Sequence, residues 1–332
     1  MMLTVLGALE APAVPLSGAE LMPRRAETFG EGLWELTTEA LGRLSPSLAE
    51  ASAVCLSLLG VVLLISVIQQ FPGSRKQTAE LVGAVAVALI LLQNTGSLVN
   101  LARETMEELS GYGKLLMGVM ASALAAQGGV TTSTALYAGT AVFDTVLMSL
   151  VTGVLIPMVY MYMAMAVAQS AMGEPLLKKL CGLIKWAATW ILKILLYVFT
   201  GYMGITGVVS GTTDAAALKA AKLTISGMVP VVGGILSDAS EAVLVSAGVM
   251  RSAAGIYGIL ALLAIVTGPF LKIGAQYLLL KATGALCSLF GSKRCSDLIG
   301  DISSGMGLML AMTGSVCLML LISMVCFLKG VA

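Results

Sequence analysis

Apolar stretches, separated by short polar intervals, run through most of this chain. A helix needs about 20 apolar residues to cross the hydrocarbon core of a bilayer, and several of these stretches reach that length. Hydrophobic residues make up 58% of the sequence and charged residues 11%, a balance that water-soluble domains rarely have. The sequence therefore predicts an all-α, polytopic helical membrane bundle with about six to eight hydrophobic segments, some of them broken or re-entrant.

The first 50 residues differ in composition from the rest. They contain seven glutamates against three arginines, and three prolines lie within the first 23 positions. We expect residues 1–50 to form an acidic, partly disordered extracytoplasmic tail, with an interfacial helix at residues 31–44. Residues 51–330 are expected to form a multi-pass transmembrane domain.

The first two predicted spans are residues 51–71 and 81–101. Arg75 and Lys76 lie between them, and basic residues in short loops mark the cytoplasmic side. The charged residues 103–108 then form an outside loop. After it, residues 112–127 are too short to span, so we favour a re-entrant segment there and a single crossing by residues 135–171; the alternative is three crossings.

A helix-breaking run interrupts the apolar sequence at residues 229–241, where Pro230, Gly233 and Gly234 precede Asp238 and Glu241. Broken backbone at membrane depth is tolerated only where protein or a water-filled cavity supplies hydrogen-bond partners. We favour a re-entrant segment over a full crossing, because it leaves three later basic residues on the cytoplasmic side: Lys281, Lys293 and Arg294.

Two kinds of residue are candidates for structural or functional roles. Asp238 and Glu241 share one helical face, where they either cap the helix or bind a cation or proton. Asp144 is a second acidic candidate, with Lys193 and Lys272 as possible counter-charges. Small residues three or four apart let helix backbones approach closely, which predicts tight packing of one helix through Gly201, Gly204 and Gly207.

Several kinds of site are not expected. The sequence has no histidine, and its six cysteines never occur as Cys-x-x-Cys, so we predict no catalytic residue, no cofactor and no metal site. Two facing aspartates for intramembrane proteolysis have no supporting motif. The net charge of +1 lacks the basic cluster that nucleic-acid binding requires.

Five stretches, in matching order and spacing, resemble the stage III sporulation protein AE family of endospore-forming bacteria. They are Ala-Ala-Gln-Gly-Gly at residues 125–129, the threonine-rich residues 131–135, Leu-Ile-Pro-Met-Val-Tyr at 155–160, residues 222–238 around Val-Pro-Val-Val-Gly-Gly, and Pro-Phe-Leu-Lys-Ile at 269–273. Family members usually begin with a cleavable signal peptide and a longer outward-facing region, and residues 1–50 depart from that pattern.

The resemblance implies a non-enzymatic, multi-pass protein of the mother-cell membrane around the forespore. Its partners would be the other stage III sporulation A operon proteins and, through them, a forespore-membrane protein, with homo-oligomers also expected. Together they would form a channel or secretion-like apparatus, powered by a separate ATPase, since this chain lacks a phosphate-binding Gly-x-x-x-x-Gly-Lys-Ser/Thr loop. The alternative is an autonomous secondary transporter that uses the broken segment as its binding site.

Overall fold

The computed structural model describes residues 13–15, 18, 20–22, 29–70, 76–126, 130–205, 253–290 and 293–331. Within these ranges the chain folds into long helices and contains no strand. The elements are α3 (Phe29–Ile68), α4 (Lys76–Ala126), α5 (Val130–Leu150), the π-helical η2 (Val151–Leu155), α6 (Ile156–Met172), α7 (Pro175–Ile205), α10 (Ala253–Leu289) and α11 (Lys293–Val331). In this part of the chain, six helical spans are long and apolar enough to cross a membrane, which confirms the predicted class.

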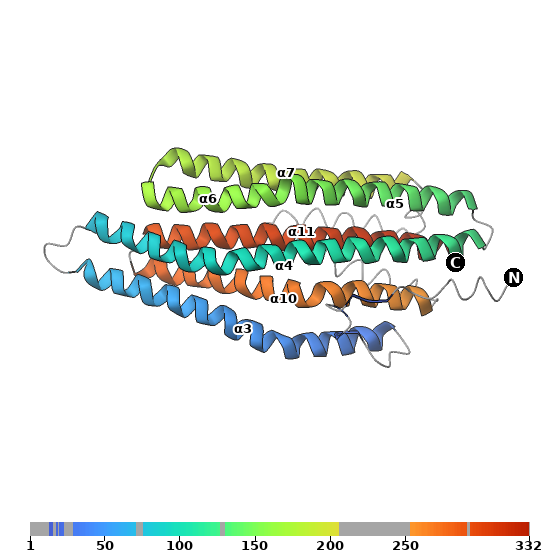
Figure 1. Cartoon of the computed structure of the whole chain (residues 1–332), viewed down its shortest axis with the longest axis horizontal. Coiled ribbons are helices and arrows are strands. Elements are labelled where there is room, and N and C mark those ends of the chain that lie inside the picture. Colours follow the sequence, from blue (N-terminus) through green and yellow to red (C-terminus); the bar gives the residue numbers. More distant parts are fainter. Residues whose placement is uncertain are drawn as a thin grey trace.

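The helices lie side by side along the long axis of the molecule (Figure 1). α5, η2 and α6 form one continuous rod, and each described span runs opposite to the one before it (Figure 1). α11 packs against α10, α4, α6, α7 and α5, and so forms the centre of the bundle. In its most apolar 18-residue stretch 89% of the residues are buried, against 22% in that of α7. α3 and α7 lie at opposite edges of the bundle (Figure 1).

Flexible and small side chains let α11 fill the centre. Met306, Met309 and Met312 are each at most 2% exposed, and methionine adapts its shape to irregular gaps between helices. Ser315 is fully buried and donates its hydroxyl to the carbonyl of Ala311, 2.7 Å away, so this polar group is satisfied within the helix.

The predicted outside loop at residues 103–108 is wrong, and so is the re-entrant segment at residues 112–127. Both belong to α4, a continuous helix of 51 residues. No proline interrupts this stretch, and Arg103 pairs with Glu107 one turn later at 2.9 Å, which supports helical backbone. At about 1.5 Å per residue, α4 is roughly 76 Å long, more than twice the thickness of a hydrocarbon core.

The predicted interfacial helix at residues 31–44 is likewise continuous with the first span. α3 runs through Pro46 and across the expected domain boundary at residue 50. The division of the chain into an acidic tail and a membrane domain stays a prediction.

Pro157 is accommodated by a change of helix type. The π-helical turn η2 precedes it, so the long segment from α5 to α6 continues through the proline. The same segment ends at Gly173, whose φ of 73° lies in the left-handed region that favours glycine. Its amide donates to the carbonyl of Gln169 at 2.8 Å and closes the turn into α7.

The prediction of tight packing through Gly201 is wrong. Gly201 is exposed, and a Cβ built on it meets nothing within 4 Å, because α7 lies at the edge of the bundle. Gly258 of α10 makes such a close approach instead: a Cβ there would lie 2.7 Å from a side-chain methyl of Leu116 in α4. Gly204 is helical, and Gly207 lies outside the described residues.

α7 ends and α10 begins at the same end of the bundle (Figure 1). These two described helix ends therefore lie on one side, as a re-entrant segment between them requires. The broken run itself, with Pro230, Gly233 and Gly234, lies outside the described residues, so its re-entrant form stays a prediction.

Candidate functional site

Basic residues gather at the end of the bundle where α6 turns into α7 and α10 leads to α11. Lys178 pairs with Asp297 at 3.4 Å, and Arg294 pairs with Glu80 at 3.4 Å. Four basic side chains lie in the first turns of α7 and α11: Lys178, Lys179, Lys293 and Arg294. The orientation rule predicts that this end faces the cytoplasm.

A second group of charged residues lies at a level about one bilayer thickness from this basic end, measured along the helices. At 1.5 Å per residue, Glu50 is about 27 Å from the end of α3, and Lys272 is about 26 Å from the end of α10. The exposed Trp190 of α7, about 22 Å from the start of that helix, lies near this level, and tryptophan is enriched at membrane interfaces. Since a hydrocarbon core is about 30 Å thick, we expect the bilayer between the two levels and the rest of the bundle beyond it.

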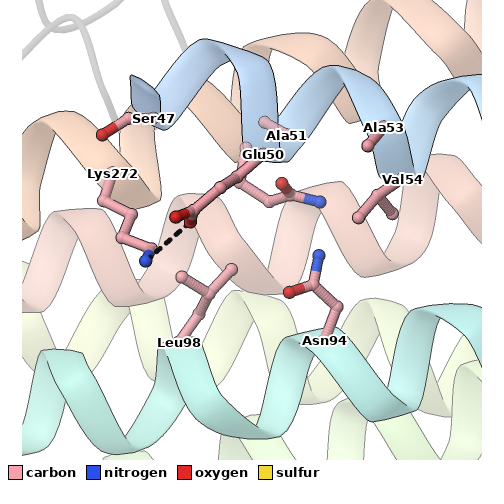
Figure 2. Close-up of a pocket in the computed structure, with 9 residues that line it drawn as sticks. Ser47, Glu50, Ala51, Ala53, Val54, Asn94, Leu98 and Lys272 are labelled. Atoms are coloured by element: carbon pink, nitrogen blue, oxygen red, sulfur yellow. Dashed lines mark ion pairs between the residues drawn. The ribbon is translucent and has the colours of Figure 1, made fainter. Parts of the chain in front are cut away.

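A polar crevice opens at this second level between α3, α4 and α10 (Figure 2). Its volume is about 370 Å³. The Lys272 ammonium donates to the Glu50 carboxylate at 2.8 Å across the opening. The Asn94 side chain of α4 lies on the opposite wall (Figure 2), and nine residues line the space: Ser47, Glu50, Ala51, Ala53, Val54, Asn94, Leu98, Lys272 and Gln276.

The walls of the crevice combine an ion pair, two carboxamides, one hydroxyl and apolar side chains. Such groups bind a polar partner by hydrogen bonds and charge. Of these groups, the Ser47 hydroxyl donates to the carbonyl of Arg43, 3.2 Å away. Within the described ranges, no three acidic or cysteine side chains are grouped to hold a metal ion.

Asp144 lies in a different place, between α5 and α4. Its side chain is 4% exposed and accepts a hydrogen bond of 2.7 Å from the hydroxyl of Ser110. The counter-charge is Lys114, with its nitrogen 3.3 Å from the carboxylate. The predicted partners are therefore wrong: Lys272 pairs with Glu50, and Lys193 is in none of the ion pairs among described residues.

The two carboxylates predicted to follow the broken run, Asp238 and Glu241, lie outside the described residues. Whether they cap a helix or bind a cation stays a prediction. Sequence reasoning missed Glu50, which it assigned to the tail, and Asn94. Their signal was position: each is a polar residue 18 positions from the basic end of its helix, which is about one bilayer thickness along the helix.

The long apolar helices, the basic turns at one end and the polar crevice define a polytopic helical membrane protein. The chain belongs to the stage III sporulation protein AE family, whose model matches residues 29–330. Stage III sporulation protein AE of Bacillus subtilis (strain 168) is 21% identical over 239 residues, which cover 72% of this chain and 60% of that protein. No solved structure matches the chain. Membership in the family gives it a role in sporulation.

Proposed function

We propose that this protein is a membrane component of a channel or secretion-like apparatus between the mother cell and the forespore, required for endospore development. It works in the mother-cell membrane around the forespore, without catalysing a reaction itself. Its partners are the other stage III sporulation A operon proteins and, through them, a forespore-membrane protein.

Family membership over residues 29–330 is the observation that carries this proposal. The packing of the described helices supports it. α11 fills the centre of the bundle with buried side chains, so the bundle offers partners its outer faces and its ends. A helical block about twice as long as a bilayer is thick also carries surface well beyond the membrane, where other components of an apparatus can bind.

The alternative is an autonomous secondary transporter. The polar crevice favours it, because ionisable groups within a helical membrane bundle often bind substrates or coupling ions. Transporter sites, however, usually lie at the bilayer midplane between broken helices. The crevice instead lies between unbroken stretches of α3, α4 and α10, near the expected interface.

Affinity purification from sporulating cells tests the proposed function. We expect a tagged chain, solubilised after mild in-cell cross-linking, to recover the other stage III sporulation A proteins at least about tenfold above an untagged control. A second control, a tagged unrelated polytopic protein of the same membrane, should recover none of them. Recovery of the chain without these partners, together with solute uptake by vesicles that contain it alone, would establish the transporter instead.

A further inference from the structure

The two edge helices of the bundle present apolar faces to their surroundings. Among the most apolar 18-residue stretches of the six spans, those of α7 and α3 have the smallest buried shares, 22% and 28%. Large exposed side chains cover both faces. On α7 they include Leu183, Trp186, Trp190, Ile194, Tyr197 and Val198, and on α3 they include Leu56, Leu63, Leu64 and Val67.

Lys193 lies in the middle of the exposed face of α7. Its neighbours on this helix face, Trp190 and Tyr197, are 47% and 56% exposed, whereas Leu192 and Leu195 point into the bundle. No ion pair among the described residues includes Lys193. An isolated ammonium group on an apolar helix face gains from a carboxylate supplied by another molecule.

The opposite edge offers such a carboxylate. The Glu50 side chain is 65% exposed, and its one ion pair among the described residues joins a single carboxylate oxygen, Oε2, to Lys272. A carboxylate has about four acceptor positions, so Glu50 can bind a second cation while it keeps the first.

The two groups also lie at similar heights along the bundle. Lys178 of α7 pairs with Asp297 of α11, and Tyr277 of α10 accepts a hydrogen bond from Ser303 of α11. Heights are measured along the bundle axis away from the basic end, at 1.5 Å per residue from these contacts. Lys193 then lies about 22 Å from Asp297, and Lys272, the ion-pair partner of Glu50, lies about 17 Å from Asp297 in the same direction. The difference is about one helical turn, which a lysine side chain can span.

We propose that a second copy of this chain binds on the α7 face, with Lys193 of one copy paired to Glu50 on the α3 edge of the next. Copies in one membrane share their orientation and are related by rotation about the membrane normal, so matching heights are preserved. A symmetric α7–α7 contact would place Lys193 against its equivalent, which repels. The pairing is therefore head-to-tail, and repetition of a head-to-tail contact closes a ring where the rotation between copies divides a full turn. This assembly does not depend on the proposed channel function.

Cysteine cross-linking between two differently tagged copies tests the proposal. In a background with the six native cysteines replaced by alanine, one copy carries Trp190→Cys and the other Ala53→Cys. These positions lie one turn from Lys193 and Glu50, towards the same end of the bundle. A membrane-permeant oxidant should produce the mixed dimer in native membranes at least about fivefold above the dimer from either variant alone.

Three further variants separate charge pairing from mere proximity. Lys193→Leu and Glu50→Gln should each lower the mixed-dimer yield at least about threefold, whereas Lys193→Arg should retain it. A within-chain pair, Glu80→Cys with Arg294→Cys, is joined by a bismaleimide that replaces the length of the two side chains in that ion pair; it reports folding and should cross-link in every variant. The proposal is overturned if this internal pair forms without the mixed dimer, if Trp190→Cys alone dimerises best, or if Lys193→Leu leaves the yield unchanged.

Discussion

Replacing Gly258 by leucine should destabilise the protein by about 3 kcal/mol, the upper range for an overpacked core. A Cβ at this position already lies 2.7, 2.8 and 3.2 Å from three side-chain atoms of Leu116, so a larger side chain separates α10 from α4. Leu116 is 1% exposed and has little space to move aside. The free energy of unfolding, measured by denaturant titration in mixed micelles, gives the effect.

Two matched variants identify the cause. Gly201→Leu places the same side chain on an exposed helix position with open space, and should change the free energy of unfolding by less than about 0.5 kcal/mol. Adding Leu116→Ala to Gly258→Ala should recover part of what each single variant loses, since the small residue leaves room for the new methyl group. If Gly258→Leu and Gly201→Leu cost the same, the close approach of α10 and α4 is wrong.

The second large effect is expected at Asp144, and it is asymmetric. Lys114→Met should cost about 3 kcal/mol, because it leaves a buried carboxylate without its counter-charge. Asp144→Asn should cost only about 1 kcal/mol, because the amide oxygen still accepts the Ser110 hydroxyl. The Lys114 side chain, 44% exposed, can then turn to solvent.

The same denaturant titration compares these variants with the double variant Lys114→Met, Asp144→Asn. We expect the double variant to be more stable than Lys114→Met alone, since no buried charge remains. Equal costs for the two single variants, or additive costs in the double variant, would contradict the assignment of Lys114 as the counter-charge.

Much of the architecture could be predicted from hydropathy and charge. The lengths of the apolar stretches predicted the helical membrane class. The basic residues between the spans predicted that three connections lie on the same side of the membrane. The described helix ends that flank these connections lie at one end of the bundle (Figure 1). The same rule predicted that α7 ends and α10 begins on one side of the membrane, because this arrangement leaves Lys281 and Arg294 on the cytoplasmic side.

The errors arose where helical backbone continued through polar sequence. Residues 103–108 resemble a loop by charge, yet glutamate and arginine are good helix formers, and an ion pair one turn apart keeps α4 intact. The length of an apolar stretch therefore predicted which residues can lie in the membrane, but it did not predict where the helix ends.

The partners of the charged side chains could be identified only from the folded structure. Ser110 and Lys114 meet Asp144 because α4 and α5 are antiparallel and only three residues apart in the sequence. This pairing could not be seen while α4 was divided into two segments. The ion pair between Glu50 and Lys272 joins residues more than 200 positions apart, and no local pattern pairs them.

Accessibility of introduced cysteines tests the central claim, that α4 crosses once and extends beyond the membrane on the side opposite the basic turns. Ser122→Cys and Glu174→Cys are placed singly in a cysteine-free background, expressed in non-sporulating cells so that the chain lies in the cell membrane, and treated with a membrane-impermeant maleimide on intact protoplasts. We predict labelling of Ser122→Cys from outside, and of Glu174→Cys only after permeabilisation. Protection of Ser122→Cys in both conditions, or labelling of Glu174→Cys from outside, would contradict the account.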